Sequence, residues 1–318
     1  MKKNLNGSKF MLFLIIWVFV LMMALQFLFI VLRESGVNVN AVMVSPWFLI
    51  AQQLVIFILP LFIWLALKGD NIKQNLPNQK LGGKNIMLII ALSFLIQPVM
   101  MTISAVMSLF VTNDVAGLMD SFMAAPFWLT ILAIAVTPAI CEELVFRGYI
   151  QSQYNDRTIK KTALINGLFF AIIHLNFHQF AYAFVMGVVF AYMVHYTRSI
   201  WAGIIPHFIV NASQAVLFRL ANMAQPAGYS PDVQAAEELL AAMPISMEAM
   251  AIIIISVIAL CLSPVIFILF REFFRHNKWR VAAGPEDGGE VSEGLQVDYY
   301  TVLVVAVFIG FMVLMMAF

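Results

Sequence analysis

Long apolar runs separated by short polar segments dominate the chain. Most of these runs reach the length of about 20 residues that a helix needs to cross the hydrocarbon core of a bilayer. Backbone groups in lipid must be hydrogen-bonded within their own segment, so helices are the expected structure. The pattern predicts an all-α fold, a polytopic transmembrane helical bundle. We expect about nine spans, near residues 10–32, 43–67, 86–111, 126–150, 162–177, 179–197, 200–219, 248–270 and 299–318.

The run at 162–177 differs from the others because it is short and ends among polar residues. Asn176, His178 and Gln179 follow its apolar stretch almost at once. We expect a short helix here, shielded by its neighbours, with its polar groups turned toward protein or water. The tight connection to the next run resembles a hairpin of two helices.

The composition of the links divides the chain into three parts. Residues 1–125 are expected to hold N-terminal transmembrane helices, 126–220 a helical core with the candidate chemistry, and 221–318 the remaining spans and links. In this last part, an extracytoplasmic link predicts a short surface helix near 231–242, because its Ser-Pro-Asp sequence is typical of a helix start. The acidic, glycine-rich link at 284–298 is expected to be a disordered cytoplasmic tether.

Lysine and arginine fall mainly in alternate links. Positively charged short loops stay on the cytoplasmic side of a membrane. With nine spans and a cytoplasmic N-terminus, 16 of the 18 basic residues lie on the inner side, and only Arg33 and Arg219 on the outer side. We therefore expect an integral multi-pass protein with its N-terminus inside. The pattern fits a bacterial inner membrane as well as an endoplasmic reticulum, and we favour the bacterial membrane.

Composition supports a membrane protein and gives no sign of a nucleic-acid partner. Hydrophobic residues make up 63% of the chain and charged residues 11%, against roughly 25% charged in an ordinary soluble protein. The formal net charge of +1 is by itself no evidence for or against a nucleic-acid or acidic partner, because in a membrane protein the placement of the charges along the chain matters. Cys141 and Cys261 lie in different apolar runs, and we expect them to be small hydrophobic residues rather than a disulfide or a metal pair.

Three charged side chains, Glu142, Glu143 and Arg147, interrupt the otherwise apolar fourth run. Ionisable groups within a membrane segment are costly, which makes them a functional hypothesis by default. On a helix Glu143 and Arg147 share a face, so the arginine can hold Glu143 as an anion. Glu142 is rotated by about 100° and is free to act as a base. The alternative is a charge cluster that merely anchors the end of the run at the membrane boundary.

Two later runs bring histidines, His174 and the pair His207 and Asn211. Taken alone, His174 would usually be a hydrogen-bonded packing group, and His207 with Asn211, four residues apart on one face, could join helices by hydrogen bonds. A metal pair of His174 and His178 lacks the glutamate of the His-Glu-x-x-His motif. Pro138 and Pro206, next to these residues, can free backbone groups or bend the helices.

The three motifs agree in depth. Measured at 1.5 Å per residue from the inner ends of their runs, Glu142, His174 and His207 could meet in the cytoplasmic half of the bilayer. Other intramembrane hydrolase chemistries lack their parts, because the chain has no His-Glu-x-x-His, no Gly-x-Ser-Gly before a matched histidine and no aspartate in the middle of a span. The sequence thus predicts a site that activates water with glutamate and histidine.

In this order the motifs resemble the CAAX protease and bacteriocin-processing family of membrane proteins, the CPBP or Abi family, which includes the type II CAAX prenyl endopeptidases. The resemblance covers about residues 126–220, which would be the catalytic core, and the three motifs together are specific where each alone is not. The matching residues are Glu142, Glu143 and Arg147 in the first motif, Phe170 and His174 in the second, and His207 and Asn211 in the third.

The resemblance implies an intramembrane endopeptidase that cuts a membrane-associated or lipidated peptide or protein. Glu142, helped by His174, would take a proton from water, and His207 with Asn211 would stabilise the oxyanion. Glu143 and the arginine of the first motif would be positioning residues.

The need for a metal stays open in this comparison. The family has been described both as metalloproteases and as glutamate-dependent proteases, and Glu142, His174 and His207 would make a Zn²⁺ shell. We favour the metal-free interpretation.

Two alternatives of other classes remain. The chain could be a non-catalytic membrane scaffold or regulator, or a bacteriocin self-immunity protein, that keeps the fold and uses the polar cluster to join helices. It could also be a transporter, since protonatable residues in a membrane serve proton relays. Scattered polar residues and two related halves would favour transport, whereas polarity here is concentrated in three runs.

Overall fold

The computed structural model describes residues 6–111, 125–154, 158–223, 245–282 and 298–317. The described part is helical throughout and contains no strand, only an isolated bridge between Asn78 and Ser199. This confirms the all-α prediction. The expected surface helix near 231–242 lies outside the described residues, as does the acidic link before Asp298.

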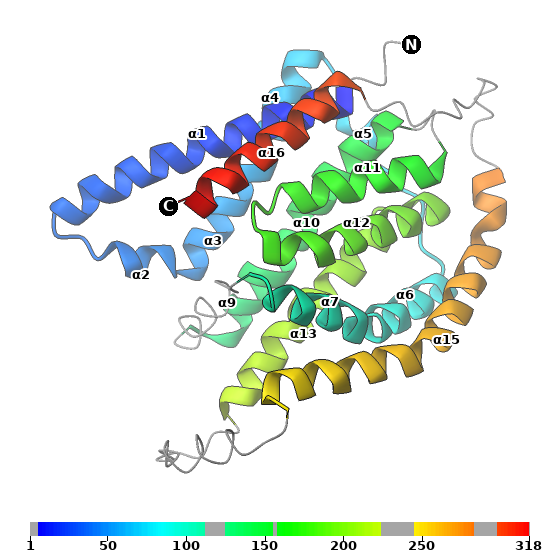
Figure 1. Cartoon of the computed structure of the whole chain (residues 1–318). Helices are drawn as coiled ribbons and strands as arrows, with labels where there is room; N and C mark the ends of the chain where they lie inside the picture. Colours follow the sequence, from blue (N-terminus) through cyan, green and yellow to red (C-terminus); the bar gives the residue numbers. More distant parts are fainter. Residues whose placement is uncertain (1–5, 112–124, 155–157, 224–244, 283–297, 318) are drawn as a thin grey trace.

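Figure 1 shows the arrangement of the helices, coloured in the order in which they follow one another along the chain. They are α1 (Asn6–Glu34), α2 (Val39–Met43), α3 (Pro46–Gln53), α4 (Leu59–Lys68), α5 (Ile72–Asn75), α6 (Gly83–Leu95), α7 (Gln97–Ser108), α9 (Phe127–Ile131), α10 (Thr137–Glu143), α11 (Ile159–Ile172), α12 (Phe177–Thr197), α13 (Trp201–Met223), α15 (Met247–Ala282) and α16 (Tyr299–Ala317). Wider π-helical turns connect some of them without a break, at Leu54–Ile58, Leu132–Val136 and Leu144–Ile150.

Seven helices in the described part are long and apolar enough to cross a membrane. Two further predicted spans also form helices: α11 has 14 residues, and α16, Tyr299–Ala317, has 19. The run at 162–177 thus forms the short helix that was expected there, while the count of nine spans and the cytoplasmic N-terminus stay predictions. The seven are Asn6–Glu34, Pro46–Lys68, Gly83–Ser108, Phe127–Tyr154, Phe177–Thr197, Trp201–Leu220 and Ala249–Val281.

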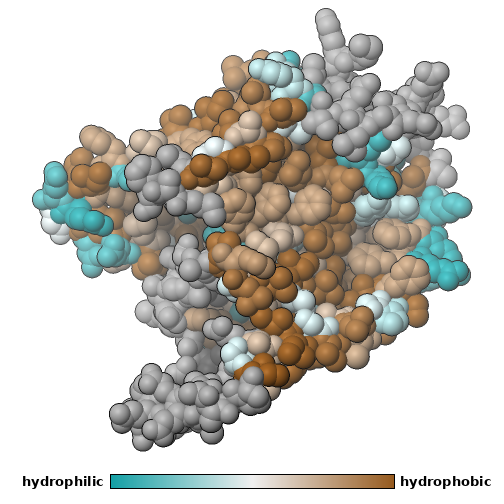
Figure 2. All heavy atoms as spheres, viewed as in Figure 1, coloured by the Kyte–Doolittle hydropathy of each residue, from teal (hydrophilic) through white to brown (hydrophobic). Residues whose placement is uncertain are grey.

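Large apolar side chains cover much of the outer surface, as expected for helices that face lipid. Figure 2 shows a face that is mostly hydrophobic, with hydrophilic patches toward its edges. Phe27, Leu260 and Phe267 are each exposed over two thirds or more of their surface. Apolar surface on this scale would be a liability in water. It supports an integral membrane protein.

Two hydrophobic clusters make up the core, and the first includes residues of the central helix, Phe127–Tyr154, which is the most buried of the seven. One cluster joins α1, α4, α11 and α16 around the residues that follow α10. The other joins α6, α7, α12, α13 and α15. Helices α1 and α16 lie side by side at one edge of the bundle, and α15 lies at the other (Figure 1). The central helix therefore packs within the first cluster and also contacts α13, a helix of the second.

Helices α11 and α12 form the tight hairpin that the sequence predicts. Asn176 caps α12 by accepting a hydrogen bond from the backbone N–H of Gln179 at 3.1 Å, as capping asparagines do. A Cβ on Gly187 would lie only 2.6 Å from the Cα of Gly167, so the helices cross where neither residue has a side chain. This close crossing brings the backbone of α12 within reach of the central helix.

Candidate active site

The helix that carries the two glutamates is irregular on both sides of them. α10 lies between the π-helical turns Leu132–Val136 and Leu144–Ile150. Thr137 supports the first turn by donating its hydroxyl to the carbonyl of Leu132 at 2.8 Å. Such turns widen a helix locally, rotate the residues that follow and are frequent at functional sites. The sequence pattern did not predict them.

Glu143, Arg147 and His207 form a fully buried charged cluster. As the four-residue spacing predicts, Arg147 Nη1 donates to Glu143 Oε1 at 2.7 Å. His207 Nδ1 lies 2.9 Å from the same oxygen. A carboxylate can only accept, so the Nδ1 of His207 carries the proton in this bond and its Nε2 faces the other way. Glu143 thereby fixes the orientation of the imidazole.

Arg147 is held by the neighbouring helices as well as by Glu143. Its Nη2 donates to the carbonyl of Gly187 on α12 at 3.1 Å. The guanidinium carbon lies 4.5 Å from the ring centre of Phe170 and 5.5 Å from that of Phe190. Stacking between aromatic rings stabilises a desolvated guanidinium. Phe170, which the resemblance assigns to the second motif, thus also stabilises the arginine of the first motif.

Gly203 is a site residue that the sequence reasoning missed. A Cβ at this position would overlap Glu143 Oε2. Only glycine lets α13 approach the carboxylate this closely. Its position one helical turn before His207 was the signal available in the sequence, because residues four apart share a helix face.

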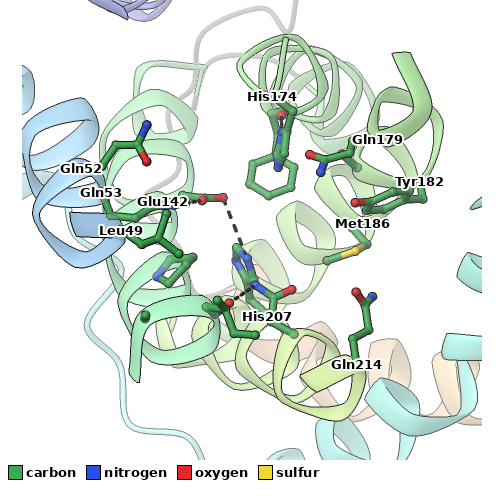
Figure 3. A pocket seen from close by; sticks show the side chains of 16 residues that line it. Leu49, Gln52, Gln53, Glu142, His174, Gln179, Tyr182, Met186, His207 and Gln214 are labelled. Atoms are coloured by element: carbon green, nitrogen blue, oxygen red, sulfur yellow. Dashed lines mark hydrogen bonds and ion pairs between the residues drawn. The ribbon is translucent and has the colours of Figure 1, made fainter. Parts of the chain in front are cut away.

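Glu142 points in a different direction from Glu143, into a cavity of about 420 Å³ (Figure 3). Gln53 Nε2 on α3 donates to Glu142 Oε1 at 3.3 Å. Glu142 Oε2 is buried and accepts no hydrogen bond within the described residues. It lies 3.9 Å from His207 Nε2, a separation that a bridging water can span. The carboxylate therefore keeps lone pairs available for a water or a substrate.

His174 lies at the end of α11 and lines the same cavity. Its Nδ1 is 2.7 Å from the carbonyl oxygen of Phe170, and the two rings are in edge-on contact at 5.0 Å. Since a carbonyl oxygen only accepts, Nδ1 carries the proton, and in the neutral ring Nε2 is left as a proton acceptor. The backbone contact makes His174 a base rather than a donor toward the cavity.

Asn211 also lines the cavity, and its amide is partly used by the backbone. Its Nδ2 donates to the carbonyl of Ile134 at 3.1 Å. Pro138, four residues after Ile134, has no N–H to offer to that carbonyl. The side chain of Asn211 replaces the missing helical hydrogen bond. One N–H of its amide remains for other partners.

Several amide and hydroxyl side chains of the cavity wall did not enter the sequence prediction. Figure 3 shows Gln52 and Gln53 on one side of the cavity and Gln179, Tyr182 and Gln214 on the other. The glutamines within the otherwise apolar second run were a signal in the sequence. What the sequence could not give is the direction in which they point.

The predicted metal donors are not arranged as a metal shell. Within the described ranges, no group of three or more His, Cys, Asp or Glu side chains could hold a metal ion. His178 is turned away from His174 and contacts Ser108 at 2.9 Å through Nε2. We derive no step through a metal.

Comparison with known proteins matches the part of the chain that carries the three motifs. Residues 124–213 match the family model described as type II CAAX prenyl endopeptidase Rce1-like. A Bacillus subtilis (strain 168) protein named "Putative membrane peptidase YdiL" is 25% identical over 107 residues. The match covers 33% of this chain and 43% of that protein, so it spans less than half of the relative's length. No solved structure matches the chain significantly.

Proposed function

We propose that the chain is an intramembrane endopeptidase. The proposal starts from its membership of the CPBP family of membrane peptidases, which rests on the match of residues 124–213 to the type II CAAX prenyl endopeptidase model. Its substrate would be a membrane-associated or lipidated peptide or protein. The observation that carries the proposal is Glu142, a buried carboxylate with a free oxygen at a cavity that two imidazoles also line. Helix-joining side chains would instead be expected to use their polar atoms on one another.

Glu142 is the general base in this proposal. Its Oε2 accepts a proton from a water in the cavity while the water oxygen attacks the carbonyl carbon of the scissile bond. The Nε2 of His174 accepts a hydrogen bond from the same water and helps to orient it. Positioned bases of this kind contribute about 10²–10⁴-fold to rate. Gln53, which donates to the other oxygen of Glu142, holds the carboxylate in place.

His207 and Asn211 stabilise the oxyanion that the attack creates. His207 can donate from Nε2 when the ring carries both protons, a form in which it lies between the carboxylates of Glu142 and Glu143. In that form the two negative charges of the glutamates are balanced by the positive charges of His207 and Arg147. Asn211 offers the amide N–H that Ile134 does not use. When the tetrahedral intermediate collapses, the proton on Glu142 passes to the departing amine.

The proposal is tested with purified protein in lipid and a pool of short peptides and membrane-protein tails. Products are identified by mass spectrometry, in H₂¹⁸O so that hydrolysis labels the new carboxyl group. We expect labelled products from the natural protein and none from Glu142→Gln. Glu272→Gln is the matched control, since Glu272 only pairs with Lys84 and Arg275 at the surface. The proposal is wrong if Glu142→Gln gives the same products as the control.

A further inference from the structure

A second cavity adjoins the candidate active site. Its volume is about 550 Å³, and it lies between α7, α12 and α13, with Ile255 of α15 also on its wall. Three residues, Gln179, Tyr182 and Gln214, line both cavities. We call these three the polar threshold. A molecule at Glu142 that extends across the threshold enters the second cavity.

The threshold is chemically suited to a peptide backbone. Gln179 and Gln214 come from different helices, and each side-chain amide offers one acceptor and two donors. Neither amide, nor the hydroxyl of Tyr182, makes a side-chain hydrogen bond to any residue that the structure describes; Gln179 is bonded only through its backbone N–H. In Figure 3 the threshold faces Glu142 and Gln53 across the cavity. These unused groups could pair with the N–H and C=O of a chain lying between them.

Beyond the threshold the available surface is apolar. Met100, Val210, Leu217 and Phe218 are among the lining residues. The polar side chains on this wall are hydrogen-bonded to other protein groups: His178 contacts Ser108 at 2.9 Å and Ser104 at 3.5 Å, Ser108 also donates to the backbone of α7, and Gln97 donates to Ser213 at 3.1 Å. A cavity with an apolar interior and polar groups at its mouth selects an apolar ligand and fixes its orientation.

We propose that the second cavity is a substrate subsite. It receives a bulky apolar side chain of the peptide, next to the scissile bond, while the peptide backbone crosses the polar threshold. This inference rests on the proposed function and names its substrate class, a peptide with a large aliphatic or aromatic residue on one side of the cut.

The first test is a specificity switch. Ala105 lines the second cavity but not the first, so Ala105→Phe fills the subsite without touching Glu142. For peptides that differ only in one residue beside the cut, the natural protein prefers the bulky residue over alanine. One methylene in an apolar pocket is worth about 10–200-fold. Ala105→Phe lowers kcat/KM by at least about 10-fold for the bulky peptide and leaves the alanine peptide within about 2-fold.

The matched control is Ala66→Phe, which makes the same change at an exposed position of α4. It keeps the natural preference. If Ala105→Phe leaves the selectivity unchanged while Glu142 is still required for cleavage, the subsite is refuted and the protease stands. If Ala105→Phe lowers the rates of both peptides equally, the second cavity does not discriminate side chains and the inference is also refuted.

A second test needs no turnover. A peptide with a photoreactive apolar residue is bound to the Glu142→Gln protein in lipid, irradiated and mapped by mass spectrometry. The subsite predicts that the peptide labels α7 at Met100 or Met101. It also predicts that Ala105→Phe removes this labelling and that Ala66→Phe does not. This result would support the subsite even if no cleavage is ever found. Labelling by a photoreactive lipid that the peptide does not displace shows that acyl chains fill the cavity and overturns the inference.

Discussion

Glu143 shows how much of the site depends on a single oxygen atom. Its Oε1 accepts from Arg147 and His207, and its Oε2 lies against Gly203. A carboxylate buried this deeply is tolerated only when it is paired. The cluster therefore ties the orientation of His207 to the packing of α13 on the central helix.

Replacing Gly203 with alanine is expected to displace the Glu143 carboxylate. The added methyl group cannot share the space of Oε2, so His207 loses the partner that orients it. A misplacement of about 1 Å at a catalytic group can cost about 10²-fold in rate, and we expect a loss of that order in kcat/KM. Gly310→Ala is the control, since a Cβ there meets nothing within 4 Å. Equal activity of the two variants would contradict this account of Gly203.

Replacing Arg147 with methionine is expected to destabilise the protein by about 3–5 kcal/mol, because it leaves the carboxylate of Glu143 buried without its cationic partner. The double variant Glu143→Leu with Arg147→Met removes both charges and should recover most of that loss. Chemical unfolding in detergent measures the difference. Arg275→Met, which breaks an exposed ion pair, should change little. A double variant as unstable as Arg147→Met alone would show that packing, rather than charge, sets the cost.

At the residue scale the sequence predicted what helix spacing determines. The contact between Glu143 and Arg147 and the different direction of Glu142 follow from 3.6 residues per turn. Helix spacing also places Gly203 on the face of His207, but the contacts of Gly203 and Gln53 with the glutamates depend on which faces of α13 and α3 meet the central helix. That choice is made by packing between helices far apart in the chain.

At the scale of elements, the central helix combines a proline with two π-helical turns around the glutamates. Pro138 cannot pair with the carbonyl of Ile134, and Asn211 of α13 does so instead. The side chain assigned to the oxyanion therefore also joins α13 to the central helix. The two roles of Asn211 can be separated by restoring the backbone donor.

A double-mutant cycle of Asn211→Ala and Pro138→Ala makes this separation. Asn211→Ala alone should cost about 1–3 kcal/mol in stability, the penalty for a buried carbonyl left unsatisfied. In the Pro138→Ala background the new backbone N–H can serve that carbonyl, so the stability cost should shrink. The loss of cleavage should persist in both backgrounds, because the oxyanion still lacks its donor. Rescue of activity together with stability would assign Asn211 a structural role alone.

The sequence predicted most helices, because a long apolar run has one stable structure in lipid. It placed α11 and α12 as a short hairpin, and the touching glycines Gly167 and Gly187 bear this out. It expected α11 to be a short helix, which has 14 residues in the structure, and the count of nine spans stays a prediction. The π-helical turns were not predicted, because hydropathy carries no information on local changes in the backbone hydrogen-bond pattern.

At the scale of the whole molecule, the exposed apolar surface requires a bilayer, and the basic residues predict its direction. With the N-terminus inside, α1 carries Ser35 to the outer side, and the following span returns Lys73 to the inner side. Both residues are exposed. The candidate site would then open in the cytoplasmic half of the bilayer.

Single cysteines test this orientation. In a Cys261→Ser background, Ser35→Cys should react with a membrane-impermeant thiol reagent added to intact cells, and Lys73→Cys should react only after the membrane is opened. Cys141 is buried and should not react with the reagent. The reverse pattern would place the N-terminus and the site on the outer side.

The convergence of three distant runs was predictable from their depth, because helices that start at the same surface bring residues at equal distance along them to one level. The cavities were not predictable. They are the space left where α3, α7, α12 and α13 do not fill the bundle, and that space depends on every side chain at once.

The most direct measurement is the kcat/KM of Glu142→Gln relative to the natural protein, in the same lipid and with the same peptide. Equal thermal unfolding temperatures would establish that both are folded. If Glu142 activates water, the kcat/KM of Glu142→Gln should fall on the order of 10²–10⁴-fold, and that of Glu272→Gln should be unchanged. A Glu142→Gln protein that cleaves within about 3-fold of the natural rate, less than any positioned base contributes, would contradict the central claim.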